Sequence, residues 1–403
     1  MKKKLCVIGA GAGASDLLTE RALQLIKNCD TVYSTSKRLS QLFSGIRNDI
    51  PECALSQLEQ TVSQCESQRL ALLVSGDTGF FSIAAGLSKK LESSCELEFI
   101  CGISSLQYFC SKLGRSYENI KSVSLHGREN NITGAVSYNA EIFVLTGGSN
   151  KAHEICKSLA ESGLGHVRAA AGESLSMPSE RIVGGSIKEL AEYTFEDLTV
   201  LLLENTGFIK PWQPLYDKDF IRSEIPMTKE EIRAVTLSKL AVEPGDTVYD
   251  IGAGTGSVAI EMARKAYEGC VYAIEQKAEA VELINKNRRK LGAYNVNVIQ
   301  GMAPQVFSAL PKPDKAFIGG SSGSMGEIVK QLKGKNPHIR LVANAITLES
   351  LNDAVKAFEE YGFEADIVCI NAAVSKKTGS YHMMNANNPI YIISGGQCPL
   401  EEK

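Results

Sequence analysis

The chain has 403 residues, more than one ordinary hydrophobic core accommodates, so its length predicts two domains. A formal net charge of −3, with 22% charged residues, excludes the strongly basic balance typical of nucleic-acid-binding proteins, and no apolar run is long enough to cross a bilayer. The 11 cysteines are scattered without a C-x-x-C pair, which predicts free thiols, no metal site and a cytoplasmic location.

Residues 1–205 show short apolar runs of strand length that alternate with helical stretches, and this pattern predicts a first domain of α/β layers. The first strand leads into a glycine loop, from Gly9 to Gly13, that looks like a nucleotide-binding turn. The next strand, residues 31–35, ends in hydroxyls and not in the carboxylate that a Rossmann site places on a ribose. A tight turn without a ligand is therefore an open alternative for this loop.

Residues 206–223 do not follow the alternating pattern. Two prolines and the only tryptophan lie between residues 208 and 223, and no clean hydrophobic period runs through them, so the stretch is predicted to be a linker. We expect Trp212 to pin this linker against a domain. The second domain is predicted at residues 224–403.

The second domain is predicted to be a Rossmann-like, doubly wound α/β sheet whose last strands form an antiparallel edge. Its first helix is expected to begin with Thr228 as N-cap, and Glu231, three residues later, completes a capping box. Strands and helices then alternate, from the strand TVYDIG to the final strands ADIVCINAAV and PIYIISG.

The segment DIGAGTGSVAIE has glycines at every second position, from Gly252 to Gly256, directly after Asp250. Because Ser257 replaces the third glycine of the dinucleotide fingerprint, the loop suits a compact ligand without a pyrophosphate. Glu275 ends the next strand, where a carboxylate can accept both ribose hydroxyls. The pattern favours S-adenosylmethionine over NAD, with an NAD-linked oxidoreductase or a plain tight turn as alternatives. Asp250 is expected to face the cationic methionine end of the cofactor or, instead, to cap the helix.

Six blocks, IPMTKEEIRA, DIGAGTGSVAIE, VYAIE, GMAP, FIGGSSG and NAITLE, occur in this order, and residues 217–396 resemble the decarboxylating C15-methyltransferases of cobalamin synthesis. The resemblance implies a class I methyltransferase that uses S-adenosylmethionine. The cofactor contacts that it implies come from Thr228, Gly252, Ala253, Gly254, Thr255, Gly256, Glu275 and, near the adenine, Ala303.

The first domain is similar to the tetrapyrrole methylase family in LLVSGDTGFFSIA, FICGISSLQ, VSLHGR, FVLTGG and AAGESLSMPSERI. The resemblance implies two α/β subdomains with S-adenosylmethionine in the cleft between them. It places Ser75, Gly76, Asp77, Ser104, Ser105 and Thr146 near the cofactor, and Gly9, Gly11 and Gly13 near the tetrapyrrole. Ala12 and Cys101 stand where the family has prolines. Asp77 is expected to orient backbone amides or the cofactor, in preference to acting as a base.

Together, the two resemblances imply a bifunctional enzyme of cobalamin biosynthesis. It would methylate one precorrin at C5 in the first domain and at C15 in the second, with loss of CO₂ from the C12 acetate, and it would use two S-adenosylmethionine sites in a homo-oligomer. Lys229 and Arg233 are candidates to pair with substrate carboxylates, although each could be a solvated surface charge. No residue is assigned as a catalytic acid or base. An RNA methyltransferase of the same fold is a further alternative, which the acidic balance disfavours.

Overall fold

The computed structural model describes residues 2–91, 94–126 and 130–397, which form two compact units. The first unit comprises residues 1–128, 141–158 and 167–204, and the second comprises residues 129–140, 159–166 and 205–403. The predicted linker, residues 206–223, therefore packs with the second unit. That residues 1–205 and 224–403 are the two domains stays a prediction.

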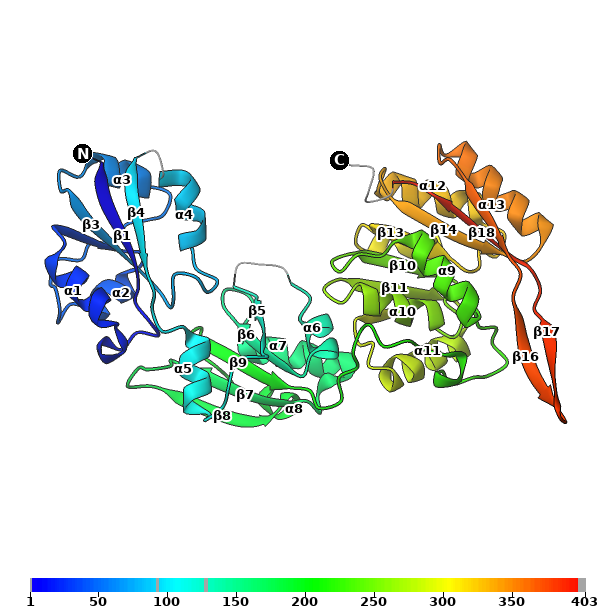
Figure 1. The fold of residues 1–403 in the computed structure, drawn as a ribbon, viewed down its shortest axis with the longest axis horizontal. Helices are drawn as coiled ribbons and strands as arrows, with labels where there is room; N and C mark the ends of the chain where they lie inside the picture. Colours follow the sequence, from blue (N-terminus) through cyan, green and yellow to red (C-terminus); the bar gives the residue numbers. More distant parts are fainter. Residues whose placement is uncertain (1, 92–93, 127–129, 398–403) are drawn as a thin grey trace. The chain divides into compact units, whose positions relative to one another are not determined.

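The first unit starts with a four-stranded parallel sheet in the order β2-β3-β1-β4 (Figure 1). Its central strands are apolar because helices cover both faces, with α1 and α2 on one side and α3 and α4 on the other. The elements are β1 (Lys3–Gly9), α1 (Glu20–Asn28), β2 (Thr31–Ser34), α2 (Lys37–Leu42), α3 (Leu58–Gln64), β3 (Arg69–Val74), α4 (Ala84–Leu91) and β4 (Cys95–Ile100).

A second sheet of five strands follows in the same unit, in the order β5-β6-β9-β7-β8, with all pairs antiparallel except β5 and β6. Two sheets with their own helices confirm the predicted pair of α/β subdomains. The elements are α5 (Ser105–Lys112), β5 (Lys121–Ser124), β6 (Glu141–Leu145), α7 (Ala152–Leu159), β7 (Arg168–Glu173), β8 (Arg181–Ser186), α8 (Ile187–Leu190) and β9 (Thr199–Glu204).

The short helix α6 (Ile132–Tyr138) lies within residues 1–205 of the sequence, yet it packs within the second unit. The Tyr138 hydroxyl donates to Asn295 Oδ1 at 2.8 Å, and Asn131 Nδ2 donates to the carbonyl oxygen of Gly269. A Cβ atom at Gly134 would overlap the carbonyl oxygen of Tyr267. The helix therefore fits only because residue 134 lacks a side chain.

The main sheet of the second unit has seven strands in the order β12-β11-β10-β13-β14-β18-β15. The first five are parallel and the last two are antiparallel to their neighbours, which confirms the doubly wound sheet with an antiparallel edge. The strands are β10 (Thr247–Ile251), β11 (Cys270–Glu275), β12 (Val296–Gln300), β13 (Lys315–Ile318), β14 (Arg340–Ala345), β15 (Asp366–Ile370) and β18 (Ile390–Gly395).

Helices cover both faces of this sheet, and side chains of β10 alternate between the two cores. Val248 joins the core formed with α9, α10 and α11, while Tyr249 and Ile251 join the core formed with α12 and α13. The strand order reverses between β10 and β13, and in open α/β sheets ligands bind at such a switch point. The helices are α9 (Glu230–Leu240), α10 (Ser257–Lys265), α11 (Ala278–Lys290), α12 (Met325–Lys335) and α13 (Leu348–Glu360).

Two local predictions about the start of the second domain were wrong. Helix α9 begins at Glu230 after Lys229, so Thr228 is not its N-cap. Trp212 is 76% exposed and does not pin the linker. Phe220, 3% exposed, does so instead, with the Arg233 guanidinium 4.9 Å from its ring centre.

A separate antiparallel hairpin, β16 (Ala373–Thr378) with β17 (Tyr381–Ala386), was not predicted (Figure 1). Every residue of both strands is exposed, including large apolar side chains such as Met383 and Met384. Within the described part of the chain, no helix combines the length and apolarity that a bilayer span requires.

Candidate active site

A cavity of about 560 Å³ lies at the carboxyl ends of β10, β11 and β13, where the strand order reverses. Three loops after these strands supply much of its wall, namely residues 252–255, 276–277 and 319–322. The sequence-predicted residues that the structure brings together here are Thr228, Lys229, Asp250, Gly252, Ala253, Gly254, Thr255, Glu275 and Ala303.

Two glycines of the loop, Gly252 and Gly256, each combine a positive φ with a neighbour where a side chain would lie. Gly252 has a φ of +73°, and a Cβ there would lie 2.9 Å from the backbone of Gly320 across the switch point. Gly256, with a φ of +77°, is the N-cap of α10, and its own Cβ would meet Ile284 at 3.0 Å. Gly256 starts the helix and does not line the cavity, and its predicted cofactor contact stays a prediction.

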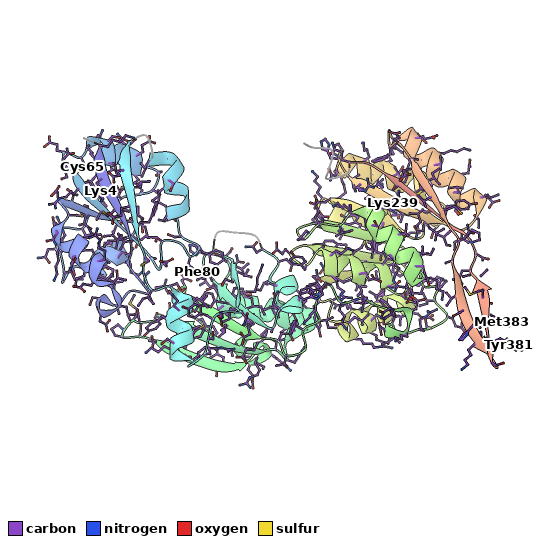
Figure 2. The ribbon with its side chains drawn as sticks, in the orientation of Figure 1. Lys4, Cys65, Phe80, Lys239, Tyr381 and Met383 are labelled. Atoms are coloured by element: carbon purple, nitrogen blue, oxygen red, sulfur yellow. The ribbon has the colours of Figure 1, made fainter. Side chains whose placement is uncertain are left out.

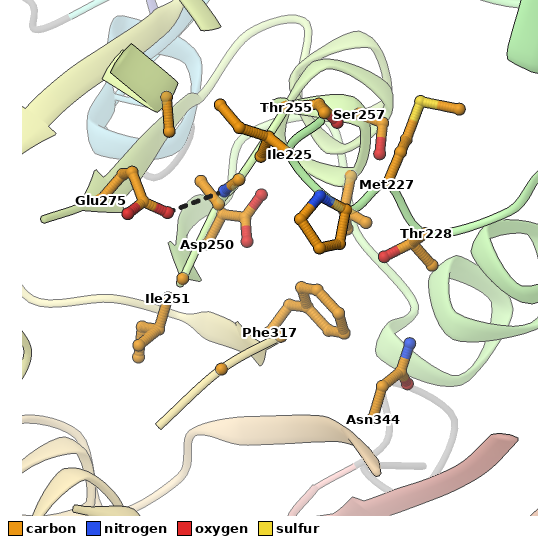
Figure 3. A pocket seen from close by; sticks show the side chains of 18 of the residues that line it. Ile225, Met227, Thr228, Asp250, Ile251, Thr255, Ser257, Glu275, Phe317 and Asn344 are labelled. Carbon is orange, nitrogen blue, oxygen red and sulfur yellow. Dashed lines mark hydrogen bonds between the residues drawn. The ribbon is translucent and has the colours of Figure 1, made fainter. Parts of the chain in front are cut away.

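Glu275 holds the loop in shape while lining the cavity (Figure 3). Its Oε2 accepts a hydrogen bond from the Gly254 amide at 3.0 Å, and its Oε1 accepts one from the Lys277 amide at 3.0 Å. The side chain is nearly buried. A carboxylate oxygen has more than one lone pair, so both oxygens can still accept hydrogen bonds from a ligand.

Asp250 and Thr255 are buried in the wall of the same cavity (Figure 3). Neither carboxylate oxygen of Asp250, nor the Thr255 hydroxyl, has a hydrogen-bond partner among the described residues. Burial raises the pKa of Asp250 to about 7, and the nearby Glu275 charge adds to the rise. The backbone amide of Ala259, in the first turn of α10, acts against this rise, so the alternative in which Asp250 caps the helix stays open.

Arg233 does not reach the cavity and is fully buried. Its guanidinium donates to Asp217 Oδ1 and Glu261 Oε1, each at 2.6 Å, and to the carbonyl oxygen of Thr228 at 2.7 Å. The prediction that Arg233 pairs with a substrate carboxylate is thus corrected: it shapes the chain beside Thr228. Lys229, by contrast, is partly exposed and lines the cavity.

Several wall residues were missed by sequence reasoning. Phe317 and Asn344 come from the ends of β13 and β14 (Figure 3). Met302 and Ile346 expose 43% and 62% of their surface. Each lies at or just after the carboxyl end of a strand, and this position was the available signal. Asn388, beside the base of the hairpin, also lines the cavity, and nothing in its local sequence indicated that.

In the first unit, three loops at the carboxyl ends of β1, β3 and β4 meet by backbone contact. Gly11 and Gly76 exchange two hydrogen bonds, of 3.0 and 2.9 Å. Asp77 accepts from the amides of Gly102 and Gly79 at 3.0 and 2.8 Å, as expected for a carboxylate that orients backbone amides. Gly9 lies against Gly102, where a Cβ on either residue would overlap the other's backbone.

The other site residues predicted in the first unit make local hydrogen bonds or pack against neighbouring loops. Ser104 is the N-cap of α5 and Ser105 is its first residue. Ser75 lies 3.5 Å from an Arg38 nitrogen. Thr146 follows β6, in the second sheet, and donates to the carbonyl oxygen of Thr199 at 2.6 Å. Gly13 packs against Met177 from the loop after β7.

Two family models match the chain: "Tetrapyrrole (Corrin/Porphyrin) Methylases" over residues 4–191 and "Precorrin methyltransferase domain" over residues 219–395. A probable cobalt-precorrin-6B C(15)-methyltransferase (decarboxylating) from Pyrobaculum calidifontis is 41% identical over 181 residues, which are 44% of this chain and 93% of the relative. The chain belongs to the precorrin methyltransferase family.

Another relative matches the chain over both units. The precorrin-6Y C(5,15)-methyltransferase [decarboxylating] of Sinorhizobium sp is 29% identical over 353 residues, covering 86% of this chain and 85% of its own. Among solved structures, precorrin-6Y C5,15-methyltransferase from Geobacter metallireducens GS-15 is 36% identical. The match covers 45% of this chain and 96% of that one, with a TM-score of 0.44.

Proposed function

We propose that this protein methylates a precorrin at two ring carbons, C5 in the first domain and C15 in the second, and releases the C12 acetate carboxyl group as CO₂. The observation that carries the proposal is the match of 86% of the chain to a relative named for both methylations and for decarboxylation. The family matches support neither the RNA methyltransferase nor the NAD-linked oxidoreductase that the sequence left open. The cytoplasmic location stays a prediction.

The cavity in the second unit fits S-adenosylmethionine as methyl donor. The Glu275 carboxylate would accept the ribose hydroxyls, Ala303 would lie near the adenine, and the glycine loop would follow the ligand closely because it carries no side chains. Asp250 and Thr255 supply buried polar atoms without a hydrogen bond of ordinary geometry to any described residue. The donor supplies a methyl group on a positive sulfur, which is a good leaving group.

The protein's own contribution to methyl transfer is alignment and the exclusion of water. Holding donor and acceptor carbon in line is worth up to about 7–11 kcal/mol of the barrier. Ile225, Met227 and Phe317 line the cavity with apolar surface, which keeps water from the reacting atoms (Figure 3). No acid or base is required to activate an enamine-like ring carbon, and we assign none.

The rim of the cavity is suited to a large, flat, acidic ring. Met302 and Ile346 expose apolar surface there, and a solvent-exposed pair of this kind is a candidate to lie against the macrocycle. Lys229 and Lys277 are the described cations that line the cavity, and either would be able to meet a carboxylate side chain of the ring. On decarboxylation, the electron pair of the broken C–C bond passes into the conjugated ring, so the substrate itself serves as electron sink.

The joined loops of the first unit are our candidate for the second donor site. Because the side chains of Asp77 and Ser104 already bind backbone amides, these residues would meet the donor through backbone atoms, together with Ser75, Gly76, Ser105 and Thr146. The tetrapyrrole would lie beside Gly9, Gly11 and Gly13, where the absence of side chains permits close approach.

Self-association through the hairpin is proposed as part of the working enzyme. Figure 2 shows Tyr381 and Met383 near the end of the hairpin that lies away from the main sheet. They are 75% and 60% exposed, and Val374 lies on the same face of the hairpin, whereas Met384 faces the other side. Contiguous apolar surface of this kind favours burial in a protein interface.

Mass spectrometry of the products tests the proposed function. The purified full-length chain, given a precorrin-6 type substrate and S-adenosylmethionine, should yield a product with two added methyl groups and one carboxyl group fewer. A reaction without the donor is the control. An unchanged substrate mass, together with tight binding of NADH or structured RNA at moderate salt, would overturn the proposal.

A further inference from the structure

The cavity of the second unit has two sides, which different strands supply. Glu275 ends β11 and Asn344 lies near the end of β14, and in the sheet order β11-β10-β13-β14 two strands separate them. Neighbouring strands lie about 4.8 Å apart, so the ends of β11 and β14 are about 14 Å from each other. Figure 3 shows Glu275 and Asn344 on opposite sides of Phe317. Because the donor ribose would lie at Glu275, the side of Asn344 is left for the methyl acceptor.

Asn344 is a half-buried amide that one buried side chain holds in place. Its Nδ2 lies 3.1 Å from Oγ1 of Thr236 on α9, and its Oδ1 lies 3.3 Å from the same oxygen. Thr236 is fully buried, so this contact restricts the orientation of the amide. An asparagine side chain has two N–H donors and one carbonyl oxygen. At least one N–H of Asn344 is therefore left for a ligand in the cavity.

Two further asparagines, residues 387–388, extend this side of the cavity. They lie between β17 and β18, and β18 pairs with β14 in the antiparallel direction. The residues just before β18 therefore lie beside the carboxyl end of β14, where Asn344 is. The acceptor side of the cavity is thus rich in amide groups, which donate hydrogen bonds without carrying a charge.

The cations among the described residues that line the cavity are Lys229 and Lys277. Lys277 follows Glu275 on the donor side, and Lys229 pairs with Asp217, with 3.7 Å between Nζ and Oδ2. Both lysines are more exposed than Asn344. A carboxylate that reaches Asn344 would therefore meet neutral N–H donors first.

We propose that Asn344 binds the carboxyl group of the ring that leaves as CO₂. The inference rests on the proposed function and assigns one of its steps to a residue. In that step the C–C bond to the carboxylate breaks, its electron pair passes into the conjugated ring, and CO₂ leaves. The pair then returns to the side-chain carbon, which takes a proton from water and becomes a methyl group.

A neutral amide suits this step better than a cation does. The negative charge of the carboxylate moves into the ring as CO₂ forms, so a cation beside the carboxylate would stabilise the ground state more than the transition state. Such a cation would slow the loss of CO₂, whereas an amide orients the carboxylate without a charge of its own. The lysines at the cavity are left for the carboxylates that the product keeps.

Mass spectrometry of products from the full chain separates methylation from decarboxylation. Asn344→Asp places a negative charge against the substrate carboxylate, and Asn344→Leu removes the amide. In both variants the ratio of decarboxylated to C15-methylated product should fall about tenfold or more, and a doubly methylated ring that keeps its carboxyl group should accumulate. Asn352→Asp, at an exposed position on α13, is the matched control and should give the wild-type product.

Thr236→Val tests the support of the amide. Valine keeps the shape of the buried side chain but removes the hydroxyl that contacts Asn344, so the product ratio should shift in the same direction by a smaller factor. Calorimetric titration with S-adenosylhomocysteine should give wild-type affinity in every variant, because the changes lie on the acceptor side. This measurement shows that the donor side of the cavity is intact.

Full decarboxylation in both Asn344 variants would overturn the inference, as would an equal fall of C15 methylation and decarboxylation. If the Asn344 variants do not fold, Thr236→Val decides alone, and an unchanged product ratio there would contradict the role of Asn344. A wild type that makes no methylated product would overturn the proposed function and this inference with it.

Discussion

Two acids at the ends of neighbouring strands, Asp250 and Glu275, differ in a way that only their hydrogen bonds reveal. Glu275 accepts from two backbone amides at 3.0 Å, whereas no described residue makes a hydrogen bond of ordinary geometry to Asp250, and the Ala259 amide only lowers its pKa. Both positions were predictable because they follow strand ends beside a glycine loop. Which acid is satisfied depends on how the loop folds back over the sheet, and sequence spacing does not contain that information.

Glu275→Ala should weaken donor binding in the second unit by about 10- to 100-fold, because hydrogen bonds to a charged group are worth about 1.5–3 kcal/mol. It should leave C5 methylation intact. Product mass spectrometry would then show a singly methylated ring that keeps its carboxyl group. Glu279→Ala, an exposed acid on α11, is the matched control. Loss of both methylations in Glu275→Ala would contradict independent sites.

Arg233→Met should destabilise the second unit by about 3–5 kcal/mol, since it leaves Asp217 and Glu261 without their buried partner. Thermal unfolding of the variant measures this directly. Lys229→Met provides the contrast: its side chain is 44% exposed, so stability should change by less than about 0.5 kcal/mol while KM for the precorrin rises. A stable Arg233→Met with a raised KM would restore the substrate role that the structure argues against.

At the scale of elements, close backbone approaches determine which loops can meet. Gly102 lies where a Cβ would be 2.5 Å from the carbonyl oxygens of both Gly9 and Gly76. The three strands that carry these loops were predictable from their apolar runs. Their contact was not, because it depends on the strand order β3-β1-β4, which brings segments far apart in the sequence side by side.

Gly102→Ala should push these loops apart and cost about 1–3 kcal/mol, the usual range for overpacking. We also expect C5 methylation to fall more than C15 methylation. Gly184→Ala, on β8 of the same unit, is the control, because a Cβ there meets no atom within 4 Å. Equal unfolding midpoints and activities in the two variants would show that the close approach is unimportant.

The role of the hairpin β16–β17 depends on its exposed apolar side chains and not on the spacing of residues along its strands. Replacing Tyr381 and Met383 by lysine should reduce the molar mass measured by light scattering if the hairpin lies in an interface between copies. Glu359→Lys, on the exposed end of α13, is the control for added charge. An unchanged mass in the double variant would remove the hairpin from the interface.

At the scale of the whole molecule, each unit has its own hydrophobic cores and its own candidate site. The Pyrobaculum relative is covered over 93% of its length by about half of this chain, which argues that the second part can fold alone. The packing of α6 in the second unit qualifies that expectation, because cutting at residue 205 removes the Tyr138–Asn295 hydrogen bond.

Residues 206–403, produced alone, should therefore fold, bind S-adenosylhomocysteine and methylate only C15, but with a lower unfolding temperature than the same part of the full chain. Circular dichroism and product analysis check both statements. An unfolded fragment would show that residues 129–140 and 159–166 are indispensable to the second unit.

The sequence by itself determined the α/β layers of the first domain, the doubly wound sheet with its antiparallel edge in the second, and the glycine loop and strand-end acids in the wall of the second-unit cavity. These features follow from the spacing of apolar residues, from the spacing of glycines and from the rule that binding sites lie at the carboxyl ends of strands. Each of these signals lies within a short segment of the sequence. The family resemblance added the chemistry.

Only the tertiary structure decided which polar groups are satisfied and which remain for a ligand. In the structure Arg233 forms buried ion pairs instead of lining the cavity, Gly256 is the N-cap of α10, and α6 packs in the second unit. Hydrogen bonding and burial are set by residues distant in sequence, such as Asp217 with Glu261 or Tyr138 with Asn295. A local pattern cannot specify such partners, because they are brought together only when the sheets and helices pack.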